Sequence, residues 1–198
     1  MRQLASKRDF MTSRKALIGI PPSTMLALMM SVFTVSMGYG IILPLLPYLI
    51  ERLLGASGDA AQVSNATGLL TGLYTLSLFL FAALWGHLSD RFGRRLILLV
   101  GLIGFGVTML TFAFVENLTA VYAERFLSGL FAAAVTPVAL AVIGDLAATE
   151  DLRARRLTFV SLAGISGFLL GPMLGVFLTR SGSNWIPFSN GVGSLTLP

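Results

Sequence analysis

One short segment, GHLSDRFGRR at residues 86–95, concentrates the charged side chains that could do chemistry. It places the carboxylate of Asp90 among three guanidiniums, each of which can pair with a carboxylate through two parallel hydrogen bonds. The three belong to Arg91, Arg94 and Arg95. Gly93 permits a tight turn, and Gly86 would let two backbones approach closely at a helix end. A loop that is basic only because it faces the cytoplasm would explain the arginines, but not Asp90 or the glycines.

Two further charges, Glu124 and Arg125, lie inside an apolar stretch at residues 118–144. Charged side chains within a membrane are functional candidates, because they face a bundle interior or a water-filled cavity. Adjacent residues do not face one another on a helix, so we expect these two to contact different partners. The alternatives are an Arg125 side chain that snorkels outward to the interface and a Glu124 on the surface.

Glycine and proline recur in two other apolar stretches. MGYGIILPLLP at residues 37–47 contains Gly38, Pro44 and Pro47, and a proline within a helix removes a hydrogen bond and kinks the axis. GFLLGPMLG at residues 167–175 spaces small residues four apart, which permits close helix contact; its members are Gly167, Gly171, Pro172 and Gly175. For both stretches the alternative is ordinary packing of membrane helices, in which glycine and proline are common.

The composition excludes several classes of protein. Of 198 residues, 55% are hydrophobic and 12% charged, with a mean hydropathy of +0.83, whereas a soluble domain carries about 25% charged residues. A soluble globular protein is therefore excluded, and so is disorder. With no cysteine and one histidine, His87, neither thiol catalysis nor a His- or Cys-based metal site is expected. A phosphate-binding GxxxxGK[ST] loop is missing from the sequence, so we expect no hydrolytic enzyme.

Five stretches are long and apolar enough to cross about 30 Å of hydrocarbon as helices. They are residues 23–50, 66–86, 96–115, 118–144 and 157–179. The connections, at residues 51–65, 87–95, 116–117 and 145–156, are short, so neighbouring helices are predicted to run antiparallel. Helices are the usual spanning element, and the predicted fold class is an all-α integral membrane bundle over residues 23–180.

The distribution of lysine and arginine predicts the orientation. Most of the 14 basic residues lie in residues 1–22 or in the connections at 87–95 and 145–156. Cytoplasmic loops accumulate such residues, so we expect a multi-pass protein of the inner (plasma) membrane with a cytoplasmic basic segment at residues 1–22. The basic residues are thus assigned to membrane edges and not to nucleic acid. The first apolar run is longer than the about 7–15 apolar residues of a signal peptide, and we expect it to be retained.

The pattern GxxxDRxGRR resembles the signature between helices 2 and 3 of the major facilitator superfamily of transporters. It is carried by Gly86, Asp90, Arg91, Gly93, Arg94 and Arg95. The motifs at residues 37–47 and 167–175 resemble those of helices 1 and 5 in its twelve-helix drug:proton antiporters, although Val176 and Thr158 stand where the helix 5 pattern has glycines. The fragment RFLSG at residues 125–129 is similar to a helix 4 motif whose arginine is proposed to influence proton transfer.

This resemblance implies the N-terminal half of a fold with two six-helix bundles, which bind substrate between them near the midplane. It implies proton-driven export of small molecules by alternating access, with the proton gradient as energy source and no cofactor. Asp90, Arg91, Arg94 and Asp145 would form a cytoplasmic latch, in which Asp145 pairs with Arg91 or Arg94. Arg125 and Glu124 would influence proton coupling. The first apolar stretch contains no acidic residue, which leaves the proton site open.

Other expectations concern the tail and the aromatic residues. Residues 181–198 are rich in Gly, Ser, Asn and Pro, and we expect an incomplete sixth helix and a chain truncated relative to a larger transporter. Its partners would be lipid, substrate, protons and a second six-helix bundle. The alternative is a non-transporting fragment or subunit, since one bundle forms only one wall of a cavity; a homodimer could rebuild the second. Aromatic candidates for a substrate path, with packing or lipid contact as the alternative, are Tyr39, Tyr74, Phe79, Phe105 and Phe131.

Overall fold

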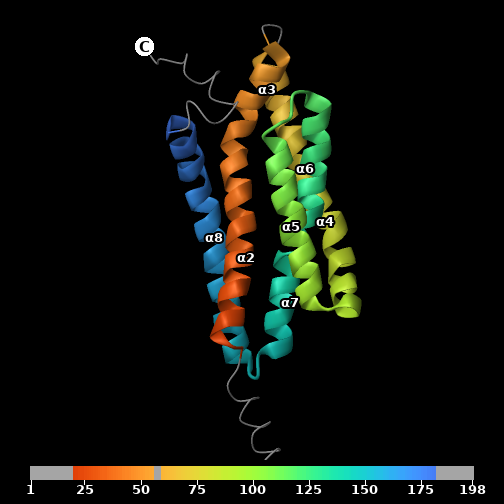
Figure 1. Ribbon diagram of the computed structural model, residues 1–198, viewed down its shortest axis with the longest axis vertical. Coiled ribbons are helices and arrows are strands. Elements are labelled where there is room, and N and C mark those ends of the chain that lie inside the picture. Colours follow the sequence, from red (N-terminus) through yellow and green to blue (C-terminus); the bar gives the residue numbers. More distant parts are fainter. Residues whose placement is uncertain (1–19, 56–58, 182–198) are drawn as a thin grey trace, which may run out of the picture.

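The computed structural model describes residues 20–55 and 59–181, and every regular element within them is a helix (Figure 1). The elements in chain order are α2 (Pro22–Ile42), the 3-10 turn η1 (Leu43–Leu45), α3 (Leu46–Leu54), α4 (Ala60–Phe92), α5 (Arg94–Phe112), α6 (Leu118–Ala132), α7 (Thr136–Leu146) and α8 (Glu150–Ser181). The all-α prediction is confirmed. Residues 1–19, which are most of the predicted basic segment, and residues 182–198, the predicted incomplete sixth helix, lie outside the described residues.

Within residues 20–55 and 59–181, five helical segments are long and apolar enough to cross a membrane, as the hydropathy of the sequence predicts. They are Pro22–Leu54, Ala60–Phe92, Arg94–Phe112, Leu118–Leu146 and Glu150–Phe177. Successive spans run antiparallel in one bundle (Figure 1). The helix starts of α2, α5 and α8 lie at its lower end, which we call the Arg94 end; the opposite one is the Pro47 end.

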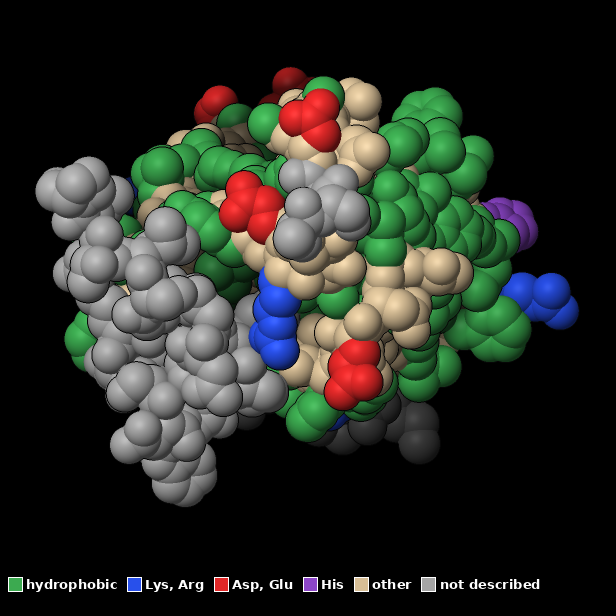
Figure 2. Space-filling view, turned by 90° about the horizontal axis from the view of Figure 1, so that it is seen from above, with side chains coloured by type: hydrophobic (Ala, Val, Ile, Leu, Met, Phe, Trp, Pro, Cys, Tyr) green, Lys and Arg blue, Asp and Glu red, His purple; other side chains and the backbone are tan. Residues whose placement is uncertain are grey.

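The space-filling view shows how the bundle separates polar from apolar surface. Viewed onto the Pro47 end, carboxylates and other polar atoms gather on the end face, and hydrophobic side chains surround it (Figure 2). The exposed charged residues at these helix ends are Glu51, Arg52, Asp59 and Glu116. An apolar belt between polar ends is the surface that a bilayer requires.

Three of the four connections are shorter than the sequence predicts, whereas the one between α5 and α6, residues 113–117, is longer than the predicted 116–117. Only Gly93 separates α4 from α5, so the predicted loop at residues 87–95 is wrong: residues 87–92 are the last turns of α4. Likewise α4 begins at Ala60 and α8 at Glu150, six and seven residues before the apolar stretches. Apolar length measures the hydrocarbon that a span crosses, while helical hydrogen bonding continues into polar residues beyond it.

Prolines interrupt two of the spans. Pro44 lies in η1 and Pro47 in the first turn of α3, so a 3-10 turn separates α2 from α3, as the kink prediction implies. The fourth span is also divided, because α6 ends at Ala132 and α7 begins at Thr136, with Pro137 in its first turn. A proline has no amide hydrogen to donate to the carbonyl four residues earlier, here that of residue 133, and its ring clashes with that carbonyl. The continuous helix expected over residues 118–144 is therefore wrong, and Pro137 is the signal that was missed.

Helices α2 and α8 pack against each other through glycines. A Cβ atom added to Gly171 would lie 2.7 Å from the Cα of Gly40, and one added to Gly40 would lie 2.6 Å from the carbonyl oxygen of Phe168. A Cβ atom added to Gly167 would come still closer to the carbonyl oxygen of Phe33. The predicted close contact is confirmed at Gly167 and Gly171, whereas Gly175 makes ordinary contact. On α2, the missing side chain of Gly38 leaves room for the ring of Phe105 to pack there. Pro172 lies inside α8.

This contact makes Gly171 sensitive to a single methyl group. We expect Gly171→Ala to lower the free energy of unfolding by about 1–3 kcal/mol, because the atoms it meets are backbone and only a separation of the helices relieves the clash. Gly106→Ala is the control, since a Cβ atom there meets nothing within 4 Å, and alanine favours a helix by about 1 kcal/mol. Thermal unfolding in detergent measures both. Equal stability of the two variants would contradict the close contact.

Candidate functional site

The guanidinium of Arg94 joins three helices at the Arg94 end. Its Nη2 lies 2.7 Å from Oδ1 of Asp90 in α4, and its Nε donates to Oδ2 of Asp145 in α7 over 3.1 Å. Its Nη1 donates to Oγ of Ser89 over 2.6 Å. Arg94 itself begins α5, directly after Gly93, whose φ of 95° suits glycine. We call Ser89, Asp90, Arg94 and Asp145 the Arg94 cluster.

Ser89 is a member of this cluster that sequence reasoning missed. Its hydroxyl donates to the carbonyl oxygen of Gly86 over 2.7 Å, which leaves its lone pairs for Arg94. The side chain is buried, whereas Asp90 and Asp145 are more than half exposed. The signal was its place inside the motif, one residue before Asp90. The cluster thus couples a buried hydroxyl to two solvated carboxylates.

Three residues of the predicted motif take no part in the cluster. The guanidinium of Arg91 lies 5.5 Å from the ring centre of Phe92, and Arg95 is exposed. A Cβ atom added to Gly86 would meet nothing within 4 Å, so the predicted close backbone approach there is wrong. Among the described residues, none packs against α4 at that position. Asp145 therefore pairs with Arg94 and not with Arg91.

Glu124 and Arg125 form a buried pair inside α6. Nε and Nη2 of Arg125 donate to the two carboxylate oxygens of Glu124, over 2.6 and 2.8 Å. The prediction that they contact different partners is wrong. Adjacent Cβ atoms diverge, but both side chains are long enough to fold back, and a buried charge without its counter-charge is strongly destabilising. Since Arg125 is 1% and Glu124 5% exposed, the snorkelling and surface alternatives are excluded.

The neighbours of the pair are aromatic or hydroxylated. Cζ of Arg125 lies 4.8 Å from the ring centre of Phe112, a cation–π contact. One turn along, Ser128 donates to the carbonyl oxygen of Arg125 over 3.1 Å. Gly129, about one turn after Arg125, packs against the backbone of Tyr74, whose ring stacks on that of Tyr39. The pair is therefore satisfied within the protein, on a helix that packs against Tyr74.

Helix α4 holds α6 in place over the two turns that follow the pair. The hydroxyl of Ser77 donates to the carbonyl oxygen of Phe126, and the indole of Trp85 donates to that of Leu130, each over 2.7 Å. A Cβ atom added to Gly129 would lie 2.6 Å from the carbonyl oxygen of Tyr74. At its start, the side chain of Asn117 caps α6 by accepting from the Ala120 amide. These contacts position Glu124 and Arg125 on a rigid element.

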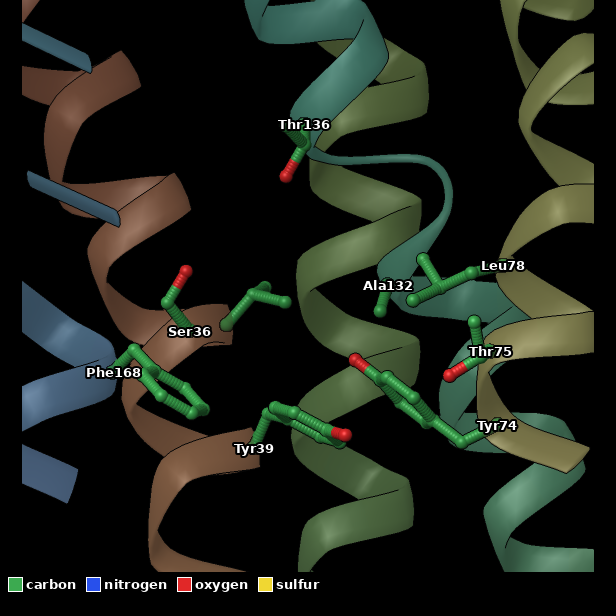
Figure 3. Close-up of a pocket in the computed structure, with 9 residues that line it drawn as sticks. Ser36, Tyr39, Tyr74, Thr75, Leu78, Ala132, Thr136 and Phe168 are labelled. Atoms are coloured by element: carbon green, nitrogen blue, oxygen red, sulfur yellow. The ribbon is translucent and has the colours of Figure 1, made fainter. Parts of the chain in front are cut away.

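An aromatic cavity of about 250 Å³ opens between α2, α4, α8 and the junction of α6 with α7 (Figure 3). The rings of Tyr39 and Tyr74 stack with centres 4.6 Å apart, and Phe168 stacks on Tyr39 at 6.0 Å. Hydroxyl groups and small apolar residues complete the lining, from Val35, Ser36, Thr75, Leu78, Ala132 and Thr136.

The other aromatic candidates lie elsewhere. Phe79 is 79% exposed on the outer face of α4. The rings of Phe105 and Phe131 pack over Gly38 and Gly104, so both have packing roles. Phe168, which sequence reasoning did not single out, takes a place in the cavity because the glycine contacts bring α8 against α2. Among the described residues no group of His, Asp and Glu could hold a metal ion.

The sequence was compared with protein families and with curated proteins, and both comparisons found transporter-related matches. The model of the Major Facilitator Superfamily matches residues 28–197. The chain is 30% identical over 158 residues to the quinolone resistance protein NorA of Staphylococcus aureus, covering 80% of this chain and 38% of that protein. It is 37% identical over 158 residues to the class B tetracycline resistance protein of Escherichia coli, covering 78% of this chain and 37% of that protein. The chain thus spans less than two-fifths of these relatives' length. With its five apolar spans and its Arg94 cluster, the chain belongs to the major facilitator superfamily.

Proposed function

We propose that this chain acts in the proton-coupled export of small molecules by alternating access. The observation that carries the proposal is the buried Glu124–Arg125 pair in a span beside the aromatic cavity. A carboxylate enclosed in an apolar span is a group that can gain and lose a proton during transport. The names of the two relatives add quinolones and tetracyclines, both of which contain an aromatic ring, as substrate classes to test.

In the proposed cycle, protonation of Glu124 changes the balance of charge in α6. The neutral acid no longer compensates the Arg125 guanidinium, which then favours new acceptors. The phenol groups of Tyr39 and Tyr74 are the proposed acceptors, because Gly129, about one turn after Arg125, packs against the backbone of Tyr74 and the two tyrosine rings stack. Because these two rings line the cavity, the protonation state would alter the surface offered to a substrate with an aromatic ring.

The Arg94 cluster would hold the Arg94 end closed. Its ion pairs join α5 to α4 and to α7, so these helices cannot separate at that end until Arg94 releases Asp145. Exposed ion pairs are each worth about 0–1 kcal/mol, small enough to break during a transport cycle. We infer that Asp90, Arg94 and Asp145 are the working parts of this latch, with Ser89 as the buried anchor.

The orientation proposed from the sequence places the Arg94 end in the cytoplasm. This end carries most of the described arginines, among them Arg91, Arg95 and the three at the start of α8. A cysteine in place of the exposed His87 tests it, because the chain has no other cysteine. We expect an impermeant thiol reagent to leave it unlabelled in sealed cells and to label it after the membrane is opened.

A drug-accumulation assay tests the export proposal. Cells without other drug exporters express the chain or its Arg94→Ala variant at equal membrane levels, and a fluorescent quinolone and tetracycline are followed. We expect lower accumulation with the original chain, and a protonophore should remove the difference. Equal accumulation in both, with or without protonophore, would support the alternative: a fragment or subunit that needs a second bundle. That alternative rests on the open side of the cavity, for which this chain supplies one wall.

A further inference from the structure

A second cavity, of about 520 Å³, lies at the Arg94 end between the start of α2 and the start of α8. Its apolar wall comes mainly from the first two turns of α2 and from Phe159. Its polar wall consists of Arg155 and Arg156 on α8. The remaining lining residues are Ile20, Pro22, Met25, Leu26, Met29 and Leu152. It is separate from both the aromatic cavity and the Arg94 cluster.

The two arginines are held at the cavity in different ways. Nη1 of Arg156 donates to the carbonyl oxygen of Ile20 over 3.0 Å, which ties α8 to the start of α2 and uses one of its donors. The exposed Arg155 has its Cζ 5.9 Å from the ring centre of Phe159. Glu150 and Asp151 begin the same helix, but neither forms an ion pair with these arginines in the described part of the chain. Both guanidiniums keep donors for an anion.

A cavity with one apolar wall and one wall of arginines fits a ligand that has both a hydrocarbon chain and an anionic group. An anionic oxygen group would satisfy the guanidiniums, and a hydrocarbon chain would cover the methionine and leucine side chains below them. Basic cavities between membrane helices at the cytoplasmic side bind lipid headgroups in this way. The cavity lies where the apolar belt of α2 and α8 meets the charged helix start, which is the depth of a headgroup. We propose that it binds an anionic glycerophospholipid, whose phosphate contacts Arg155 and Arg156 and whose acyl chain lies along Met25 and Met29.

The positive charge of the cavity favours an anionic lipid over the chain's own basic leading segment and over a zwitterionic lipid. The chain's own residues 1–19 contain five lysines and arginines against one aspartate, so they carry the same sign as the cavity. A zwitterionic lipid brings a cationic group with its phosphate and gains less from two arginines. A free phosphate would leave the apolar wall uncovered. The site therefore favours a lipid with net negative charge and at least one acyl chain.

The test compares two arginines two positions apart on α8. Arg155 lines the cavity, whereas the guanidinium of Arg153 lies beside Gly144 of α7 and outside it. Native mass spectrometry of the purified full chain measures binding of phosphatidylglycerol and of phosphatidylcholine with identical acyl chains. We expect tighter binding of phosphatidylglycerol. We expect Arg155→Gln to weaken that binding about tenfold, as the loss of a charge-assisted hydrogen bond implies, while Arg153→Gln leaves it unchanged.

Four results would overturn the proposal. Equal losses in the two variants would mean that only the overall charge of the helix start matters. Equal binding of the two lipids would remove the role of the anionic group. Competition by glycerol phosphate at the lipid's own concentration would show a site for the headgroup alone. Tighter phosphatidylglycerol binding after removal of residues 2–18 would assign the cavity to the chain's own leading segment. None of these measurements depends on export.

Discussion

Glu124→Gln is expected to abolish proton-driven drug export while the bundle stays folded. Glutamine has nearly the shape of glutamate and keeps one carbonyl oxygen for the Arg125 guanidinium, but it cannot exchange a proton. If Glu124 carries the proton, the loss should be complete at every pH at which the original chain is active. Drug uptake into inverted membrane vesicles under an imposed pH gradient measures it. Glu116→Gln is the matched control, because it removes an exposed carboxylate at the start of the same span.

Stability measurements separate this role from a structural one. Removing one partner of a buried ion pair costs about 3–5 kcal/mol, so we expect Arg125→Met alone, which leaves the Glu124 carboxylate without a counter-charge, to lower the unfolding temperature, and to lower it further at alkaline pH, where a proton no longer neutralises that carboxylate. The double variant Glu124→Gln with Arg125→Met strands no charge and should regain much of that loss. If Glu124→Gln instead exports normally while remaining folded, the pair is structural and the proton site lies elsewhere.

Hydropathy located the five spans, because the requirement for an apolar belt acts on composition averaged over about 20 residues. Hydropathy did not predict the features that depend on single residues, namely the break in the fourth span and the ends of the helices. Pro137 divides the fourth span by a local backbone effect that an average does not detect. The helix ends were also missed, since hydrogen bonding extends α4 and α8 through polar residues.

The candidate site was predictable in its residues but not in its contacts. Spacing in the motif identified Asp90 and Arg94, and Asp145 lies 51 positions after Arg94, so only the fold could choose its partner. For Glu124 and Arg125 the backbone direction of neighbouring residues pointed to separate partners, and the low dielectric of the interior brought them together. Phe168 reached the aromatic cavity only through helix packing. Tertiary contacts of this kind leave no signal in a single sequence.

Arg94→Ala is expected to open the Arg94 end and to expose residues beneath the cluster. Ile97, one turn further along α5, is 4% exposed and packs with Ala134 and Val138. A cysteine at this position in the otherwise cysteine-free chain reports on opening through its alkylation rate. Loss of ion pairs worth about 1 kcal/mol together should raise that rate about fivefold. Asp145→Asn, which keeps the Asp90 and Ser89 contacts, should give a smaller increase.

Arg91→Ala separates the latch from the general basic charge of the motif. Arg91 belongs to the same sequence pattern, but its guanidinium lies over Phe92, away from Asp145. We therefore expect it to leave the alkylation of the cysteine at position 97 unchanged. An increase as large as that of Arg94→Ala would mean that the positive charge of this helix junction, and not the three-way contact of Arg94, holds the end closed. The order Arg94→Ala, Asp145→Asn, Arg91→Ala thus follows from the number of cluster contacts each substitution removes.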